Sequence, residues 1–208
     1  MFNLNPLNPE IWDKHYKKDI STLQYPDENL VRILSKLKLQ GKALDHGSGS
    51  GRHIKLLRDF GFEVSACDYS KESILKINSF YKDVPTFLIK EAILPYQNES
   101  FDIIVSWGVL HYNESEEALK IILELKRILK KDGFLIGSIR SSNDTHLKMK
   151  DQIVNLKDIQ GSKVKLYTLE ELKLLLQNFE QVQYAYMERT LMGNLEERIC
   201  HWIFQAKN

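Results

Sequence analysis

The sequence has little cysteine, no long apolar run and no excess of charge of either sign. Cys67 and Cys200 lie far apart and match no metal-ligand spacing, so we expect no metal site. No stretch of 18 apolar residues occurs, which argues against a membrane-spanning helix. The first residues also lack a charged lead followed by an apolar run, and a cytoplasmic protein is therefore the expectation.

The balance of charge disfavours several classes of partner. Twenty-nine basic residues against 28 acidic ones leave a formal net charge of +1. Without a basic excess the chain lacks the electrostatic signature of a nucleic-acid or anionic-membrane binder, so we expect no DNA and no membrane partner. Its 208 residues fit a single domain with a sizeable core, residues 1–208. Monomer and homodimer both remain open.

Short apolar runs alternate with stretches of helical periodicity. The runs predict strands at residues 43–44, 62–67, 86–89, 101–106 and 134–139. The periodic stretches predict helices at residues 52–60, 71–81 and 114–130. Basic residues followed by Gly133 are expected to end the last of these helices. A capping box at Thr168–Glu171 predicts the start of another helix.

This alternation predicts an α/β fold, a doubly wound and mostly parallel sheet with helices on both faces. Two further strands, residues 182–189 and 198–206, bring the expected number to seven. Only residues 190–197 separate them, too few for a parallel crossover, so they should form an antiparallel C-terminal hairpin. Residues 1–40 are expected to form a helical lead-in or cap, and the polar segment 140–167 is a candidate lid.

The most informative segment is a glycine-rich turn that follows the first strand. Asp45 ends that strand, and Gly47, Gly49 and Gly51 lead into a helix. Glycines allow the backbone to approach a ligand, and the helix that follows presents free N–H groups. A dinucleotide-binding turn would require a third glycine at Arg52. The observed spacing disfavours a nicotinamide oxidoreductase, and an acid beside the turn suits a ligand that carries an ammonium group.

A second acid, Asp68, ends the second strand, where a carboxylate can accept hydrogen bonds from both hydroxyls of a ribose. Any nucleoside ligand would suit this position. Asp68 therefore supports the class of ligand and does not identify it.

Five segments in this order resemble the class I S-adenosylmethionine-dependent methyltransferases, in particular their small-molecule branch. The glycine turn, Asp68 and the stretch Glu91–Asp102 resemble the family's first motif, ribose acid and acidic-Ala-x-x-Leu-Pro element. Ile104–His111 and Glu124–Gly133 resemble the segments around strands four and five. Glu91 departs from the more usual aspartate. A sixth element, Trp12-Asp-Lys-His-Tyr16, resembles a lead-in motif whose tyrosine can contact the methionine carboxylate.

The resemblance implies S-adenosyl-L-methionine as cofactor, with S-adenosyl-L-homocysteine as product. The residues it places at the cofactor are Tyr16, Asp45, His46, Gly47, Ser48, Gly49, His53, Asp68, Tyr69, Ser70, Glu91, Ala92, Ser106 and Trp107. Packing alone is the alternative role for Tyr16, and helix capping is the alternative for His53.

His111, after the fourth strand, is the candidate catalytic residue because it should face the acceptor. Packing or helix capping is its alternative role. Arg140, Asp144 and His146 lie in the candidate lid, where Arg140 could bind an acidic acceptor. His15 could reach the pocket, and His201 is expected to be structural.

The expected reaction is in-line transfer of a methyl group to an oxygen or nitrogen of a small molecule. After the fourth strand the chain reads Ser106-Trp-Gly-Val, without the proline pair typical of enzymes that methylate DNA bases or glutamine. Two alternatives stay open: a non-catalytic subunit that binds the cofactor and assists a partner, and a methyltransferase that acts on protein or RNA.

Overall fold

A computed structural model describes residues 9–18, 24–90, 93–147, 152–154 and 159–208 of the chain. Within these ranges no helix combines the length and the apolarity needed to cross a membrane. Glu91 and Ala92, two of the predicted cofactor residues, fall outside the described residues.

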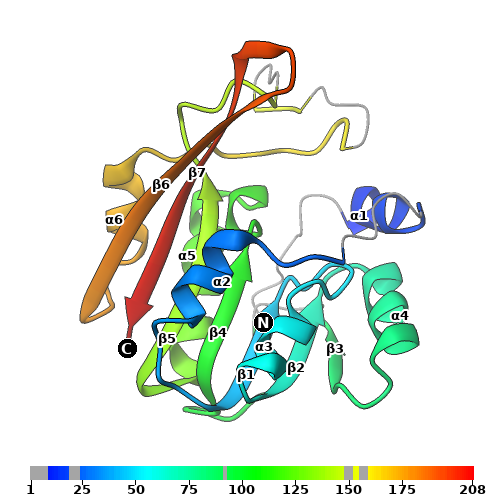
Figure 1. Ribbon diagram of the computed structural model, residues 1–208, viewed down its shortest axis with the longest axis vertical. Coiled ribbons are helices and arrows are strands. Elements are labelled where there is room, and N and C mark those ends of the chain that lie inside the picture. Colours follow the sequence, from blue (N-terminus) through cyan, green and yellow to red (C-terminus); the bar gives the residue numbers. More distant parts are fainter. Residues whose placement is uncertain (1–8, 19–23, 91–92, 148–151, 155–158) are drawn as a thin grey trace.

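The strands form one seven-stranded sheet in the order β3-β2-β1-β4-β5-β7-β6 (Figure 1). They are β1 (Gly41–His46), β2 (Phe62–Asp68), β3 (Thr86–Leu88), β4 (Phe101–Trp107), β5 (Leu129–Arg140), β6 (Gln181–Leu191) and β7 (Asn194–Lys207). The first five run parallel, and β7 lies antiparallel between β5 and β6. The predicted doubly wound sheet with an antiparallel hairpin is confirmed.

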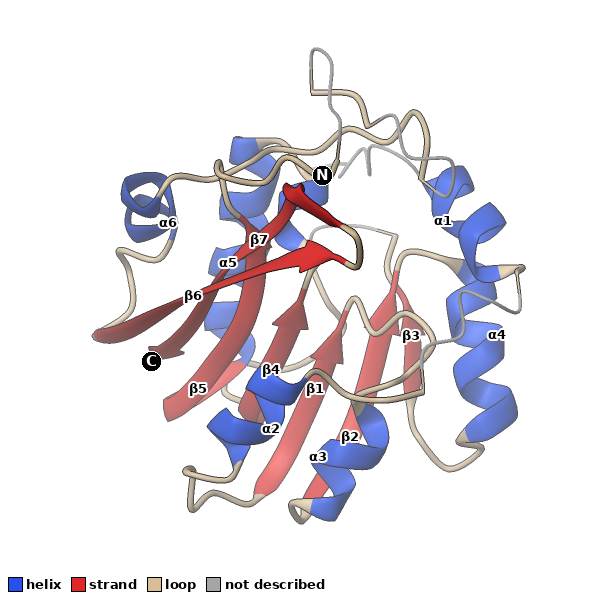
Figure 2. Ribbon diagram, turned by 45° about the horizontal axis from the view of Figure 1, so that its top comes forward, coloured by secondary structure: helices blue, strands red, loops and turns tan. Residues whose placement is uncertain are grey.

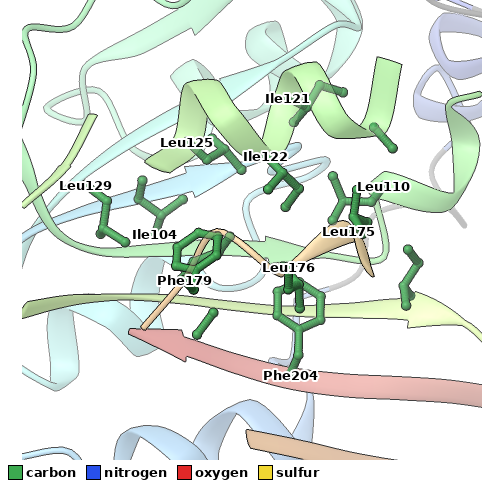
Figure 3. Packing of buried hydrophobic residues seen from close by; sticks show 14 of the residues in the cluster. Ile104, Leu110, Ile121, Ile122, Leu125, Leu129, Leu175, Leu176, Phe179 and Phe204 are labelled. Atoms are coloured by element: carbon green, nitrogen blue, oxygen red, sulfur yellow. The ribbon is translucent and has the colours of Figure 1, made fainter. Parts of the chain in front are cut away.

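Helices cover both faces of this sheet (Figure 2). They are α1 (Pro9–Tyr16), α2 (Glu28–Leu34), α3 (Ile54–Asp59), α4 (Lys71–Phe80), α5 (Ser115–Ile128) and α6 (Leu169–Leu175), with a short 3-10 turn η2 (Leu110–Tyr112). One buried cluster joins the sheet to α2, α3 and α4. Another joins it to α5 and α6, where Ile122, Leu125 and Leu176 pack towards Phe204 of β7 (Figure 3).

The junction between α5 and β5 differs from the prediction. The helix ends at Ile128, and the left-handed residue of the turn is Asp132, with φ 64°, rather than Gly133. Gly133 is needed for a different reason, since a Cβ there would lie 2.9 Å from the Lys130 carbonyl oxygen and 3.0 Å from that of Asp102. The glycine therefore permits close backbone packing where β4 and β5 begin, in the interior of the sheet.

The C-terminal hairpin is also tighter than predicted. Strands β6 and β7 continue towards each other until only Met192 and Gly193 separate them, and Gly193 has φ 79°. The two-residue turn fits a glycine with positive φ. The alternation of apolar and polar residues does not mark the strand ends, because both faces of the hairpin tip are exposed. Leu195, for example, is 77% exposed.

The described residues of the lead-in and of the segment 140–167 meet above the carboxyl ends of the parallel strands. Leu147, Val154, Ile159 and Val164 form a small cluster of their own, against which Trp12 of α1 and Tyr112 of η2 pack. Backbone bonds hold the segment at both ends. Tyr167 N donates to Arg140 O at 2.9 Å and Lys165 N to His111 O at 2.8 Å. Its role as a lid stays a prediction.

Candidate active site

A cavity lies at the carboxyl ends of β1, β2 and β4, where ligands bind in open α/β sheets. Its wall combines the glycine turn, the ends of three strands and the inner side of α1. The lining residues are Trp12, His15, Tyr16, Gly47, Ser48, Gly49, Ser50, Arg52, His53, Asp68, Tyr69, Trp107, Gly108, Val109 and Tyr112. Eight of the predicted cofactor residues are therefore brought together here: Tyr16, Gly47, Ser48, Gly49, His53, Asp68, Tyr69 and Trp107.

The glycine turn is shaped by conformation and by close contact. Gly47 and Gly49 have φ of 67° and 56°, a region that other residues rarely adopt. A Cβ on Gly47 would lie 2.3 Å from Val109 Cγ2, and one on Gly49 would lie 2.5 Å from Tyr16 Oη. The backbone of this turn thus forms part of the cavity wall, with no room for side chains.

Behind the turn, Asp45 and His53 form a buried polar pair, with 1% and 3% of each residue exposed. Asp45 Oδ1 lies 3.8 Å from His53 Nδ1, too far for a hydrogen bond. Asp45 Oδ2 and His53 Nε2 are buried and have no partner among the described residues. His53 does not cap α3 with its side chain. Buried polar atoms normally have partners, so these two indicate that a polar ligand completes the site.

Asp68 stands at the opposite side of the turn. Its Oδ2 accepts from Gly49 N and its Oδ1 from Ser70 N, both at 2.8 Å. Burial raises the pKa of this carboxyl to about 6, while the two backbone donors lower it. Each oxygen retains a second lone pair with which it can accept a hydroxyl group.

Helix α1 closes the cavity from above. Asp13 Oδ1 accepts from Ser70 Oγ at 2.6 Å and from Glu72 N at 3.3 Å, which ties α1 to the N-terminus of α4. A carboxylate also suits the positive end of a helix. Burial, together with Asp68, raises the pKa of the Tyr16 phenol, so it remains a protonated donor. Sequence reasoning missed Asp13, although it lies within the Trp-Asp-x-x-Tyr element.

Four of the predicted cofactor residues do not line the cavity: Asp45, described above, and His46, Ser70 and Ser106. His46 and Ser106 are buried and share a hydrogen bond of 3.1 Å between Nδ1 and Oγ. Burial lowers the pKa of His46 to about 4, so the ring is neutral at pH 7. Ser70 caps α4, its Oγ accepting from Ser73 N at 3.2 Å. These side chains hold the ends of β1, β4 and β2 in place.

His111 also lies one layer behind the cavity. The residue is 2% exposed and does not line the cavity, but it lies beside Gly108, which does; a Cβ added to Gly108 would lie 4.0 Å from His111 Cε1. Its Nδ1 accepts a weak bond of 3.4 Å from Arg140 N. Burial, with help from Arg140 and His201, holds the pKa of His111 well below its usual value. Such an imidazole is neutral and a poor proton acceptor.

Residues 44–137 match the model of a methyltransferase-domain family. The match includes the glycine turn, Asp68, strands β2 to β4 and parts of β1 and β5, whereas α1, which also lines the cavity, lies outside it. The matched stretch, a little less than half of the chain, belongs to this methyltransferase-domain family. The match and the fold support a class I methyltransferase that uses S-adenosylmethionine as its cofactor, as the resemblance implied.

Relatives of this methyltransferase differ in the acceptors for which they are named. A Bacillus subtilis protein named for guanine-N1 methylation of 23S rRNA is 31% identical over 48% of this chain, and the match spans only 34% of that protein. Human EEF1A lysine methyltransferase 2 is 26% identical over 70% of each chain. A Burkholderia thailandensis 1,6-didemethyltoxoflavin N1-methyltransferase, solved with that compound and S-adenosylhomocysteine, superposes with a TM-score of 0.66 at 18% identity, covering 93% of this chain and 83% of that one.

Proposed function

We propose that this methyltransferase transfers the methyl group of S-adenosylmethionine to an oxygen or nitrogen of a small-molecule acceptor. The observation that carries the proposal is the buried pair Asp45 and His53, which present atoms without partners behind the glycine turn. The amino-acid end of the cofactor has both an ammonium and a carboxylate. Asp45 would accept from the ammonium, whereas His53 Nε2 and the Tyr16 phenol would donate to the carboxylate.

The remaining residues of the wall fit the nucleoside end. Asp68 would accept the ribose hydroxyls with its free lone pairs, and Tyr69 lines the same end of the cavity. When bound, the cofactor supplies a methyl group that is already activated by the sulfonium charge. The chain therefore has to place an acceptor in line and exclude water, and such orientation alone is worth effective molarities of about 10⁵–10⁸ M.

Aromatic side chains support the exclusion of water. Trp12 lies edge-on to Tyr112 with ring centroids 4.6 Å apart, and Trp12 stacks on Tyr16 at 6.1 Å. These rings join α1 to η2 directly above the cavity. An acceptor entering beside them would lose its hydration against an apolar wall, which favours a small and partly apolar molecule over a folded macromolecule.

His111 enters this proposal in a different role from the one predicted. Since Nδ1 accepts from Arg140 N, the neutral ring carries its proton on Nε2. We propose that His111 contributes a hydrogen-bond donor on the acceptor side and does not remove the acceptor's proton. In that case, turnover should show no ionisation of an ordinary histidine between about pH 6 and 7.

The second candidate function is methylation of protein or RNA, which the names of the two sequence relatives favour. The near-neutral charge of the chain favours the small molecule. Turnover separates these candidates. The isolated chain is incubated with S-adenosylmethionine and, in separate reactions, a panel of small metabolites, total RNA and total protein. S-adenosylhomocysteine formed with metabolites alone supports the proposal. Formation with RNA or protein alone contradicts it, and none with any acceptor favours a non-catalytic subunit.

A further inference from the structure

A second group of polar side chains lies at the carboxyl end of β5 and at the neighbouring residues of the antiparallel strand β7, outside the cavity wall. Arg140 ends β5 and pairs directly with His201 of β7. His111 of η2 joins them, its ring centroid 6.4 Å from that of His201 and its Nδ1 bonded to Arg140 N. The fold therefore brings one guanidinium and two imidazoles together from three separate elements.

The pairing of the strands directs this group towards the cavity. Trp107, which lines the cavity, pairs with Ser138 of β5. Side chains two residues apart on a strand share a face, as do directly paired residues. Arg140 and His201 thus lie on the same face as Trp107, one step further along the carboxyl edge of the sheet. His111 lies beside Gly108, which belongs to the cavity wall.

The acids near this group are already engaged. Asp144, whose side chain is fully buried, accepts from the Arg140 guanidinium, from Cys200 N at 2.9 Å and from Leu147 N at 3.1 Å. Asp27 caps α2, accepting from Asn29 N at 2.9 Å. In contrast, Arg140 Nε and His201 Nδ1 are buried without a partner among the described residues. Asp144 therefore fixes the orientation of Arg140 and leaves donors of its guanidinium available.

We propose that Arg140, with His201 and His111, binds an anionic oxygen group of the methyl acceptor, so that the acceptor is a small carboxylic acid or a similar organic anion. This inference rests on the proposed function, because it assigns the group to the acceptor of the same reaction. A planar guanidinium held by a buried carboxylate suits the geometry of a carboxylate ligand.

The electrostatic environment is consistent with an anion. Burial, followed by the charge of Arg140, lowers the pKa of His201 to about 4, and both factors also lower the pKa of His111. The charged groups that act on His201 are Arg140, Asp144, Arg189 and Asp27. Both imidazoles are thus neutral at pH 7 and can donate one hydrogen bond each. A cationic acceptor would bind poorly here, because Asp144 already accepts from three donors and the charge of Arg140 would repel it.

The test is an NMR titration of the isotopically labelled full chain, saturated with S-adenosylhomocysteine. The probes are sodium benzoate and its neutral amide, benzamide, at constant ionic strength. We expect the ring resonances of His201 and His111 and the Nε–H resonance of Arg140 to move saturably with benzoate alone. Arg140→Gln should weaken benzoate binding by about tenfold to a hundredfold, the effect of one charge-assisted hydrogen bond. Arg32→Gln, at an exposed arginine of α2 that pairs with Glu28, is the matched control and should bind normally.

Several outcomes would overturn the proposal. Resonances that do not move saturably, that move equally with benzamide, or that move equally in Arg140→Gln would reduce Arg140 to a structural partner of Asp144. If Arg140→Gln fails to fold, Arg140→Lys keeps the charge without the planar fork and should also bind benzoate more weakly. Calorimetry with S-adenosylhomocysteine tests the proposed function separately. If that ligand does not bind, the proposed function fails, whereas the benzoate titration of the chain alone still decides the anion site.

Discussion

Asp68 is the residue of the site whose charge should depend most on pH in the range near neutrality. A carboxyl with a pKa of about 6 loses its negative charge when the pH falls through that value. Hydroxyl donors of a ribose favour the ionised form, so binding of S-adenosylhomocysteine should weaken as the pH is lowered from 7.5 to 5. Asp68→Asn should lose about 1.5–3 kcal/mol of binding free energy at pH 7.5. It should also lose most of the pH dependence.

Calorimetry at several pH values measures both effects. Asp83→Asn is a suitable control, because that carboxylate is exposed and paired with Arg58 at 2.7 Å, away from the cavity. Equal affinity and an equal pH profile for Asp68→Asn and the wild type would remove Asp68 from the binding site.

Adding a single methyl group at Gly49 tests whether the glycine turn must lie against Tyr16. Gly49→Ala places a Cβ 2.5 Å from Tyr16 Oη on a backbone with φ 56°. The left-handed conformation alone costs about 1–2 kcal/mol for an L-residue. Gly193→Ala in the hairpin turn has the same handicap, with φ 79°, but meets no atom within 4 Å. Both variants should melt at a lower temperature, whereas only Gly49→Ala should bind S-adenosylhomocysteine more weakly. A normal affinity in Gly49→Ala would show that Tyr16 does not close on the turn.

Among the helices, α1 contributes Trp12, His15 and Tyr16 to the cavity wall. Its anchor is Asp13 on the N-terminus of α4. Asp13→Ala should loosen α1 and weaken S-adenosylhomocysteine binding by about tenfold, the loss of roughly one hydrogen bond to a charged group. Hydrogen exchange of the α1 amides should rise in parallel. Lys14→Ala, at an exposed position of the same helix, should change neither. Faster exchange without a loss of affinity would separate α1 from the cofactor site.

The elements also show what a sequence can predict. The helical periodicity of apolar residues and the capping residues predict a helix well, because both depend on residues that are neighbours in the chain. The Thr168–Glu171 capping box is present as predicted, and α4 ends one residue before its predicted end. The predicted end of α5 was wrong because Gly133 is required by its close approach to the backbone of Asp102, a residue far away in sequence, and not by the end of the helix. Both strands of the hairpin were predicted, but their exposed ends carry too little alternation to mark where they stop.

The same limit applies to the site. Asp45, Gly47 and Gly49 could be placed together from the sequence because they belong to one local turn, whereas Asp68 could be named only from its position at the end of the second strand. The positions of His46, Ser106 and His111 depend on how β1, β4 and β5 pair, and a linear pattern does not show which side chains this pairing buries. The meeting of Arg140 with His201 follows from the register between β5 and β7, which only the folded sheet displays.

At the scale of the whole molecule, parallel strands bring the ends of β1, β2, β4 and β5 to one edge, where α1 and the described residues of the segment 140–167 cover them. The central claim is that this edge binds a sulfur-containing nucleoside. Calorimetric titration with S-adenosylmethionine, S-adenosylhomocysteine and NADH in parallel tests it most directly, after any co-purified ligand has been removed. We predict micromolar binding of the first two ligands and none of NADH. Binding of NADH, or failure of both sulfur nucleosides to bind, would contradict the claim.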